Sequence, residues 1–323
     1  MGDVAVSVNN AKELSTRRVQ QTKSKRSYYL KRYRFMYLML LPALAFYATF
    51  SYYPMYGITL AFKQYMFNLG VLRSPWVGLA NFQLMFQDPQ FWNAFRNTIE
   101  ISLGRLAFEF PVAIILALLL NELGRSKMKR VYQTVLTFPH FLSWVVFSGI
   151  MIEILGDTGI VDGILSQFGI HGFDPLVTPS VFRPLLFITD NLKEVGWGTI
   201  IYLAAIAGVN PELYEAAYVD GAGRLRQMWH VTLPGIRGTI SILLIFAVGG
   251  LMNAGFDQIF NMYSGPVQPV SDILQTYVFR LAFVSGNGFD IPTAAGLFSS
   301  VIGGLLLLGA NWVIKRMGQE GLF

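Results

Sequence analysis

Long apolar runs dominate the pattern of this chain. A helix that crosses a membrane needs about 20 mostly apolar residues, and six runs reach that length. Their bounds are 35–62, 97–121, 131–156, 190–209, 238–263 and 294–314. The fourth run is the weakest, because its apolar centre is short and charged residues crowd its start. The pattern predicts an all-α, polytopic membrane protein with six transmembrane helices.

Positive charge is unevenly shared between the segments that join these runs. With a cytoplasmic N-terminus, eighteen of the 25 Lys and Arg residues fall in inside segments and six in outside segments or at span edges. Cytoplasmic loops carry the excess of Lys and Arg in membrane proteins, so we expect both termini in the cytoplasm. The predicted division is a basic cytoplasmic tail over 1–34, a transmembrane domain over 35–317 and a C-terminal tail over 318–323.

Composition and charge agree with lipid as the surroundings of this chain. It is 53% hydrophobic and 14% charged, whereas soluble domains are about 25% charged. Nine basic and two acidic residues give 1–34 a charge of +7, and the rest of the chain sums to −1, for a net charge of +6. This tail adjoins an apolar run, which favours contact with membrane lipid over binding of nucleic acid. The absence of cysteine excludes a disulfide scaffold and a thiolate metal site.

A loop between the fourth and fifth spans, 210–237, has the local signals of two short helices. Asn210 is a good N-cap and Pro211 suits the first helical position. Gly221 permits a sharp turn, and a second helical stretch over 224–231 stops near Pro234. The loop is therefore predicted to form a helix-turn-helix on the cytoplasmic face.

The spacing within this loop resembles a known motif. It reads Glu215-Ala216-Ala217, three residues, Gly221, nine residues, then Val231-Thr232-Leu233-Pro234. This is similar to the EAA loop of the permease subunits of ATP-binding-cassette importers. Val231 and Trp229 stand where Ile and Phe are commoner in that family, and these small differences leave the motif intact.

The resemblance implies that the loop is a coupling helix, which seats in a groove of an ATP-binding subunit. The residues carried over to that role are Glu215, Ala216, Ala217, Asp220, Gly221, Arg224, Leu233 and Pro234. The sequence has no phosphate-binding Gly-x-x-x-x-Gly-Lys-Ser/Thr loop. We therefore expect no catalytic residue and no cofactor in this chain, with ATP and magnesium bound by two partner ATP-binding subunits. The other expected partners are a second homologous permease and an extracytoplasmic solute-binding protein.

Polar residues inside the spans are candidates for a substrate pathway, because they are costly in lipid. Asn253, Asp257 and Asn261 are four residues apart, so one continuous helix would place them on one face. Gln258 is adjacent, and Tyr263 and Trp197 could stack on sugar rings. The alternative is that this stripe holds helices together.

The start of the fourth span is a second candidate region. It carries Asp190, Asn191 and Lys193, and the alternative is a solvated outer boundary. In the second span, Arg105 and Glu109 are four residues apart and are predicted to pair within one helix. If the substrate is a polyanion, Lys193 and Arg105 could instead contact its carboxylates.

The stretch over 197–205 looks like the carbohydrate-uptake branch of the permease family. Within that branch, the long basic N-terminus is similar to subunits that import complex saccharides such as alginate or pectin fragments. The function implied is half of an ATP-driven saccharide pathway in a bacterial cytoplasmic (inner) membrane. The alternatives are a permease for an amino acid, a peptide or an ion, and an ion-driven secondary transporter, which leaves the loop at 210–237 unexplained.

Overall fold

The computed structural model describes most of the chain beyond its basic tail. The described residues are 29, 32–124, 126–157, 159–169, 172–286, 288–319 and 321–323. The chain divides into two compact units, 1–58 and 59–323. Most of the predicted basic tail therefore lies outside the described residues. Every contact that builds the site below lies in the second unit.

The first predicted span is a continuous helical segment, as expected. Helix α2 (Arg34–Tyr47) continues through η1 (Ala48–Tyr52) and η2 (Tyr53–Phe62). No residue of α2 or η1 is buried. A helix that is apolar on all sides and unburied matches a lipid or protein surrounding.

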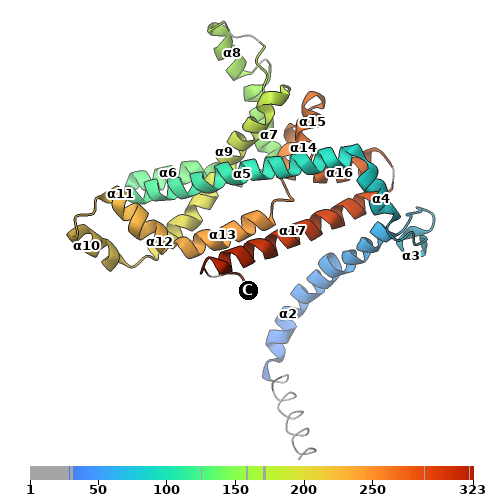
Figure 1. The fold of residues 1–323 in the computed structure, drawn as a ribbon, viewed down its shortest axis with the longest axis horizontal. Helices are drawn as coiled ribbons and strands as arrows, with labels where there is room; N and C mark the ends of the chain where they lie inside the picture. Colours follow the sequence, from blue (N-terminus) through green and yellow to red (C-terminus); the bar gives the residue numbers. More distant parts are fainter. Residues whose placement is uncertain are drawn as a thin grey trace, which may run out of the picture. The chain divides into compact units, whose positions relative to one another are not determined.

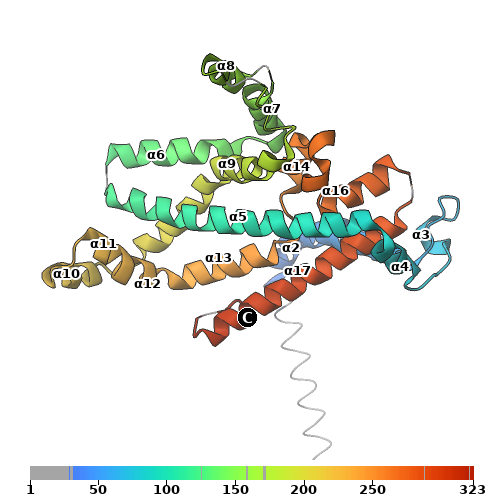
Figure 2. The ribbon, with the colours of Figure 1, turned by 45° about the horizontal axis from the view of Figure 1, so that its top comes forward.

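The second unit is built around α5 (Pro89–Glu122), which packs against α9 (Pro179–Ala207). Helix α13 (Arg237–Gly249) contacts both α5 and α17 (Asp290–Arg316), and Figures 1 and 2 show these three side by side. Helix α5 also contributes to three separate apolar clusters, through Ile101, Phe91 and Ala117, respectively. It is therefore the central helix of this unit.

Shorter helices complete the second unit, and the described residues contain no β-strand. Before the loop at 210–237 they are α3 (Gly70–Arg73), α4 (Ala80–Gln87), α6 (Lys127–Thr137), η3 (Phe138–Phe141), α7 (Trp144–Leu155) and α8 (Ile160–Gln167). The later ones are α10 (Pro211–Val219), α11 (Arg224–Gln227), η4 (Met228–Thr232), α12 (Leu233–Gly235), α14 (Phe256–Met262), η5 (Gly265–Val267), α15 (Gln268–Ser271), α16 (Leu274–Phe279) and η6 (Arg280–Val284). The predicted all-α class is confirmed.

The number of spans depends on how bent helices are counted. Within the part of the chain that the structure describes, four helical segments are long and apolar enough to cross a membrane: Arg34–Phe62, Pro89–Glu122, Trp144–Gln167 and Asp290–Arg316. Two further pairs qualify if each bent pair is one span, namely Pro179–Ala207 with Pro211–Val219 and Arg224–Gly235 with Arg237–Gly249. The total of up to six agrees with the sequence prediction.

The predicted start of the fourth span was wrong. Helix α9 begins at Pro179, eleven residues before the expected boundary at Asp190. Asp190 and Lys193 are buried in the middle of the helix. They are tolerated there because each has an opposite charge beside it. The alternative of a solvated outer boundary is therefore excluded for both residues.

The predicted third span, 131–156, is not one helix. Helix α6 ends at Thr137, and η3 carries Pro139, whose ring cannot donate the backbone hydrogen bond of a continuing α-helix. The side chain of Ser143 then caps α7 by accepting the N–H of Val146 at 3.3 Å. A proline followed by a new N-cap explains the break.

The predicted fifth span, 238–263, is also broken. Helix α13 ends at Gly249, and α14 starts at Phe256. Between them, Ala254 and Gly255 have positive φ values of 48° and 71°, which no α-helix contains. The continuous face expected for Asn253, Asp257 and Asn261 therefore does not exist, because the first of these precedes the break.

Candidate functional site

The loop at 210–237 folds as the sequence predicts. Asn210 caps α10 by accepting the N–H of Glu212 at 3.1 Å, and Pro211 occupies the first helical position. Gly221 ends the helix with φ of 75°. The N–H of Ala222 then donates to the carbonyl of Ala217 at 2.9 Å. These bonds make the turn a defined element between α10 and α11.

The surface of this loop is exposed and partly apolar. Among the predicted coupling residues, Ala217 and Leu233 are half-buried, and the other six are exposed: Glu215, Ala216, Asp220, Gly221, Arg224 and Pro234. Tyr218, Val219, Leu225 and Trp229 are each at least 68% exposed. Large apolar side chains gathered among charged ones are typical of a surface that binds another protein.

One side-chain contact joins this loop to α5, and another joins its two halves. The guanidinium of Arg224 lies 3.7 Å from the carboxylate of Glu122 at the end of α5. The hydroxyls of Tyr214 and Thr232 form a hydrogen bond of 3.0 Å between α10 and η4. The axes of α9 and α10 meet at 73°. The loop is therefore connected to α9 through the chain and to α5 through Arg224.

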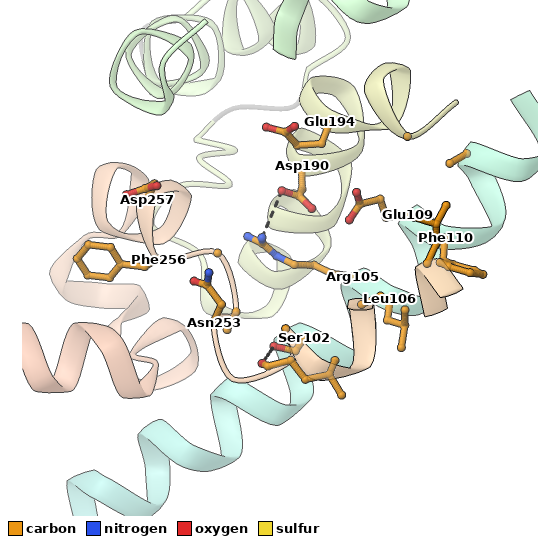
Figure 3. Close-up of a pocket in the computed structure, with 18 of the residues that line it drawn as sticks. Ser102, Arg105, Leu106, Glu109, Phe110, Asp190, Glu194, Asn253, Phe256 and Asp257 are labelled. Carbon is orange, nitrogen blue, oxygen red and sulfur yellow. Dashed lines mark hydrogen bonds and ion pairs between the residues drawn. The ribbon is translucent and has the colours of Figure 1, made fainter. Parts of the chain in front are cut away.

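A cavity of about 480 Å³ lies between α5, α9, α13 and the turn before α14. At its centre, Arg105 of α5 forms an ion pair with Asp190 of α9 at 3.2 Å (Figure 3). The same guanidinium donates to the side-chain oxygen of Gln258 in α14. One arginine thus connects three helices.

The interruption of the helix before α14 leaves room for the Arg105 side chain. A Cβ atom on Gly255 would overlap the guanidinium of Arg105. Gln258, fully buried behind the cavity, donates to the Leu186 carbonyl at 3.0 Å and to the Thr189 hydroxyl at 2.6 Å. The close backbone approach and the left-handed φ both require glycine at position 255.

The cavity is lined by more negative than positive charge. Its described acidic residues are Glu109, Asp190, Glu194 and Asp257, and Arg105 is its basic residue. Figure 3 shows Glu109, Asp190 and Glu194 on one side of the guanidinium and Asn253 and Asp257 on the other. Carboxylates and the Asn253 amide offer many acceptors, a set that suits hydroxyl groups.

The predicted pairing of Arg105 with Glu109 was wrong. Within the described residues, the ion-pair partner of Arg105 is Asp190 on another helix. Lys193 lies apart from the cavity lining: its ammonium contacts Glu194 at 2.8 Å and the His140 carbonyl at 3.1 Å. Both cations therefore already have a carboxylate partner in this conformation.

The other predicted pathway residues divide between the lining and the packed interior. Asn253, Asp257 and Asp190 line the cavity, whereas Gln258 supports it from behind. The remaining residues do not line it: Asn191, Lys193, Trp197, Asn261 and Tyr263. Trp197 instead stacks on His140 with ring centroids 4.7 Å apart, so one face of its indole is covered.

Sequence reasoning missed several lining residues. Ser102 donates to the Leu251 carbonyl, and Tyr202 contributes from α9. One signal was available: Ser102, Arg105 and Glu109 are three and four residues apart, which places three polar groups on one face of an apolar helix. Gly255 gave no such signal, because its role depends on a side chain from α5.

Comparison with known proteins identifies the family. A family model described as "Binding-protein-dependent transport system inner membrane component" matches residues 109–318. The chain belongs to this family. It is a multi-pass transport permease of the cytoplasmic membrane. The exposed loop at 210–237 lies within the matched region, and most residues that line the cavity do too.

Known relatives of this permease align with it over nearly the whole length of both chains. Protein LplB of Bacillus subtilis (strain 168) is 43% identical over 91% of this chain and 92% of its own length. The polygalacturonan/rhamnogalacturonan transport system permease protein YteP of the same organism is 41% identical over 90% of each. The match is therefore to complete permease subunits.

A solved structure shows the same architecture. A chain of a bacterial ABC transporter involved in the import of the acidic polysaccharide alginate superposes with a TM-score of 0.83. It is 37% identical, and the match covers 90% of this permease and 98% of that chain. The transporter has also been solved in complex with an alginate pentasaccharide-bound periplasmic protein.

Proposed function

We propose that this permease forms half of the membrane pathway of an ATP-driven importer for fragments of a uronate-rich polysaccharide. The observation that carries the proposal is the full-length similarity, at 37% and 41% identity, to permeases named for alginate and for polygalacturonan and rhamnogalacturonan. A loaded external binding protein would deliver the saccharide, and a second homologous permease would complete the pathway.

The loop at 210–237 would couple this pathway to ATP hydrolysis. Two partner subunits would bind ATP and magnesium, and their closure would move the exposed α10 surface. Glu215 and Asp220 supply charge there, while Tyr218 and Val219 supply exposed apolar area. Because α10 is joined to α9 through a sharp bend, its movement would be passed to the helices that line the cavity.

The cavity around Arg105 would receive sugar hydroxyls. Asn253 and Asp257 are exposed into it and come from the turn and from α14. The lining has four carboxyl groups and one guanidinium, which is paired with Asp190, so it favours sugar hydroxyls over sugar carboxylates. The charge on a uronate cargo would therefore be met elsewhere in the complex, with this lining holding the neutral ring edges.

Uptake by the assembled transporter tests the cargo class. Proteoliposomes would contain this chain, its partner permease and ATP-binding subunits, with the binding protein added outside. Galacturonate and alginate oligomers should stimulate ATPase activity and accumulate, whereas an amino acid, a dipeptide and phosphate should do neither. Stimulation by a non-sugar solute alone would refute the proposal, and uptake driven by an ion gradient without ATP would favour a secondary transporter.

A further inference from the structure

A second cavity, of about 400 Å³, lies between α14, α16 with η6, and α17. Its apolar residues are Phe256, Leu274, Val278, Phe279 and Phe283, and its polar residues are Gln275, Ser299 and Ser300, with Gly296 beside them. Ligand sites typically have such a lining, mostly aromatic and aliphatic with a few polar groups. No residue predicted from the sequence belongs to it.

The two cavities share one lining residue, Phe256. This residue lines both of them, whereas the next residue, Asp257, lines only the Arg105 cavity. Successive residues on a helix point about 100° apart, so Asp257 turns away from the second cavity while Phe256 borders both. The start of α14, set by the break at Gly255, therefore forms the boundary between the two cavities.

The apolar wall of the second cavity is a connected set of phenylalanine rings. Phe256 and Phe279 have ring centroids 6.2 Å apart, and Phe279 and Phe283 have centroids 5.3 Å apart. Phe283 is 69% exposed. A row of aromatic faces offers flat apolar area that can pack against the C–H faces of sugar rings.

The polar wall has unused hydrogen-bonding groups. Ser300 donates to the Gly296 carbonyl at 2.9 Å, and its oxygen can still accept. Gln275 and Ser299 make no side-chain hydrogen bond with another described residue. An amide that is half-buried and has no partner is suited to a ligand with hydroxyl groups, since it both donates and accepts.

We propose that this second cavity is a saccharide subsite, which holds further rings of an oligosaccharide whose leading ring occupies the Arg105 cavity. Gln275 binds ring hydroxyls and the Phe279–Phe283 wall packs against a ring face. The proposal rests on the saccharide cargo proposed above and extends it. Each cavity is within the range of small-ligand sites, about 300–1,000 Å³. Because Phe256 borders both of them, we infer that one extended chain reaches both.

The dependence of uptake on oligomer length tests this subsite. Complete transporter in proteoliposomes would be supplied with the same binding protein and with di-, tri- and tetragalacturonate. Gln275→Leu should lower tetragalacturonate uptake about tenfold, as expected for about one lost hydrogen-bonding group, and leave digalacturonate uptake within about twofold. Phe283→Ala should show the same length dependence, and its exposed ring can be removed without leaving a hole in the core.

The matched control is Gln83→Leu, the same chemical change on an exposed residue of α4 that lines neither cavity. It should leave uptake of every length unchanged. An equal loss for all lengths, or loss of the second permease on co-purification, would show that the cavity seats a partner helix or lipid and would overturn the subsite. Unchanged uptake in both variants would also overturn it. If the unmodified transporter takes up no saccharide, the cargo proposal fails first, and the subsite fails with it.

Discussion

Arg105 and Asp190 form an ion pair of 3.2 Å between α5 and α9, with their side chains only 13% and 5% exposed. The guanidinium also reaches Gln258, 153 residues later in the chain. Three helices that line one cavity are thereby held by a single cation. The backbone break at Gly255 is shaped around the same group, so the pair and the break form one structural unit.

Removal of one partner of this pair should strongly destabilise the permease. Asp190→Asn leaves a buried guanidinium without its counter-charge, a change that costs about 3–5 kcal/mol. The double variant Arg105→Gln with Asp190→Asn removes both charges and should be more stable than either single variant. Thermal unfolding in detergent would measure this. Breaking the exposed pair of Arg96 and Glu100 by Arg96→Gln is the control and should leave the melting temperature nearly unchanged. Additive losses in the double variant would contradict the pairing.

Gly255→Ala should disturb the cavity more than any ordinary glycine substitution in this chain. The new Cβ would overlap Arg105, and the residue sits at φ of 71°. Strained left-handed residues cost about 1–3 kcal/mol before any clash is counted. Gly238→Ala is the matched control, because it lies within α13 with nothing within 4 Å of the new atom. That change should be neutral or stabilising by up to about 1 kcal/mol, as melting temperatures would show. Equal behaviour of the two variants would argue against the close approach.

Gly221→Pro should abolish ATP-driven uptake while the chain still inserts in the membrane. Gly221 has φ of 75°, which proline, fixed near −65°, cannot adopt. Glu215→Lys should have the same effect by reversing an exposed charge on α10. Gly223→Ala, in the same turn with nothing within 4 Å, should keep uptake near the unmodified level. Uptake and co-purification of the ATP-binding subunits are the measurements, and normal uptake in the first two variants would refute the coupling role.

The chain lacks cysteine, so its predicted orientation can be tested with single introduced thiols. Phe67 is 91% exposed, and Lys127 is exposed beside the end of α5. In intact spheroplasts, a membrane-impermeant maleimide should label Phe67→Cys. It should label Lys127→Cys only after the membrane is opened. The reverse pattern would place the N-terminus outside and overturn the topology inferred from the Lys and Arg distribution.

The sequence alone determined the parts of this protein that depend on neighbours in the chain. The apolar runs follow from composition over about 20 residues. The helix-turn-helix over 210–237 follows from Asn210, Pro211 and Gly221, whose capping, fixed φ and left-handed turn act within a few residues. These features were therefore predictable, along with the family resemblance that the loop carries.

Only the tertiary structure decided how the charged residues inside the spans are arranged. The four-residue spacing predicted an ion pair between Arg105 and Glu109 on one helix. In the structure the guanidinium pairs instead with Asp190 on a neighbouring helix. A buried charge needs such a closely placed partner to offset its desolvation. The same guanidinium neutralises Asp190 inside α9 and lies against Gly255 at the break in the fifth span. Such contacts join residues far apart in the chain, and no local pattern encodes them.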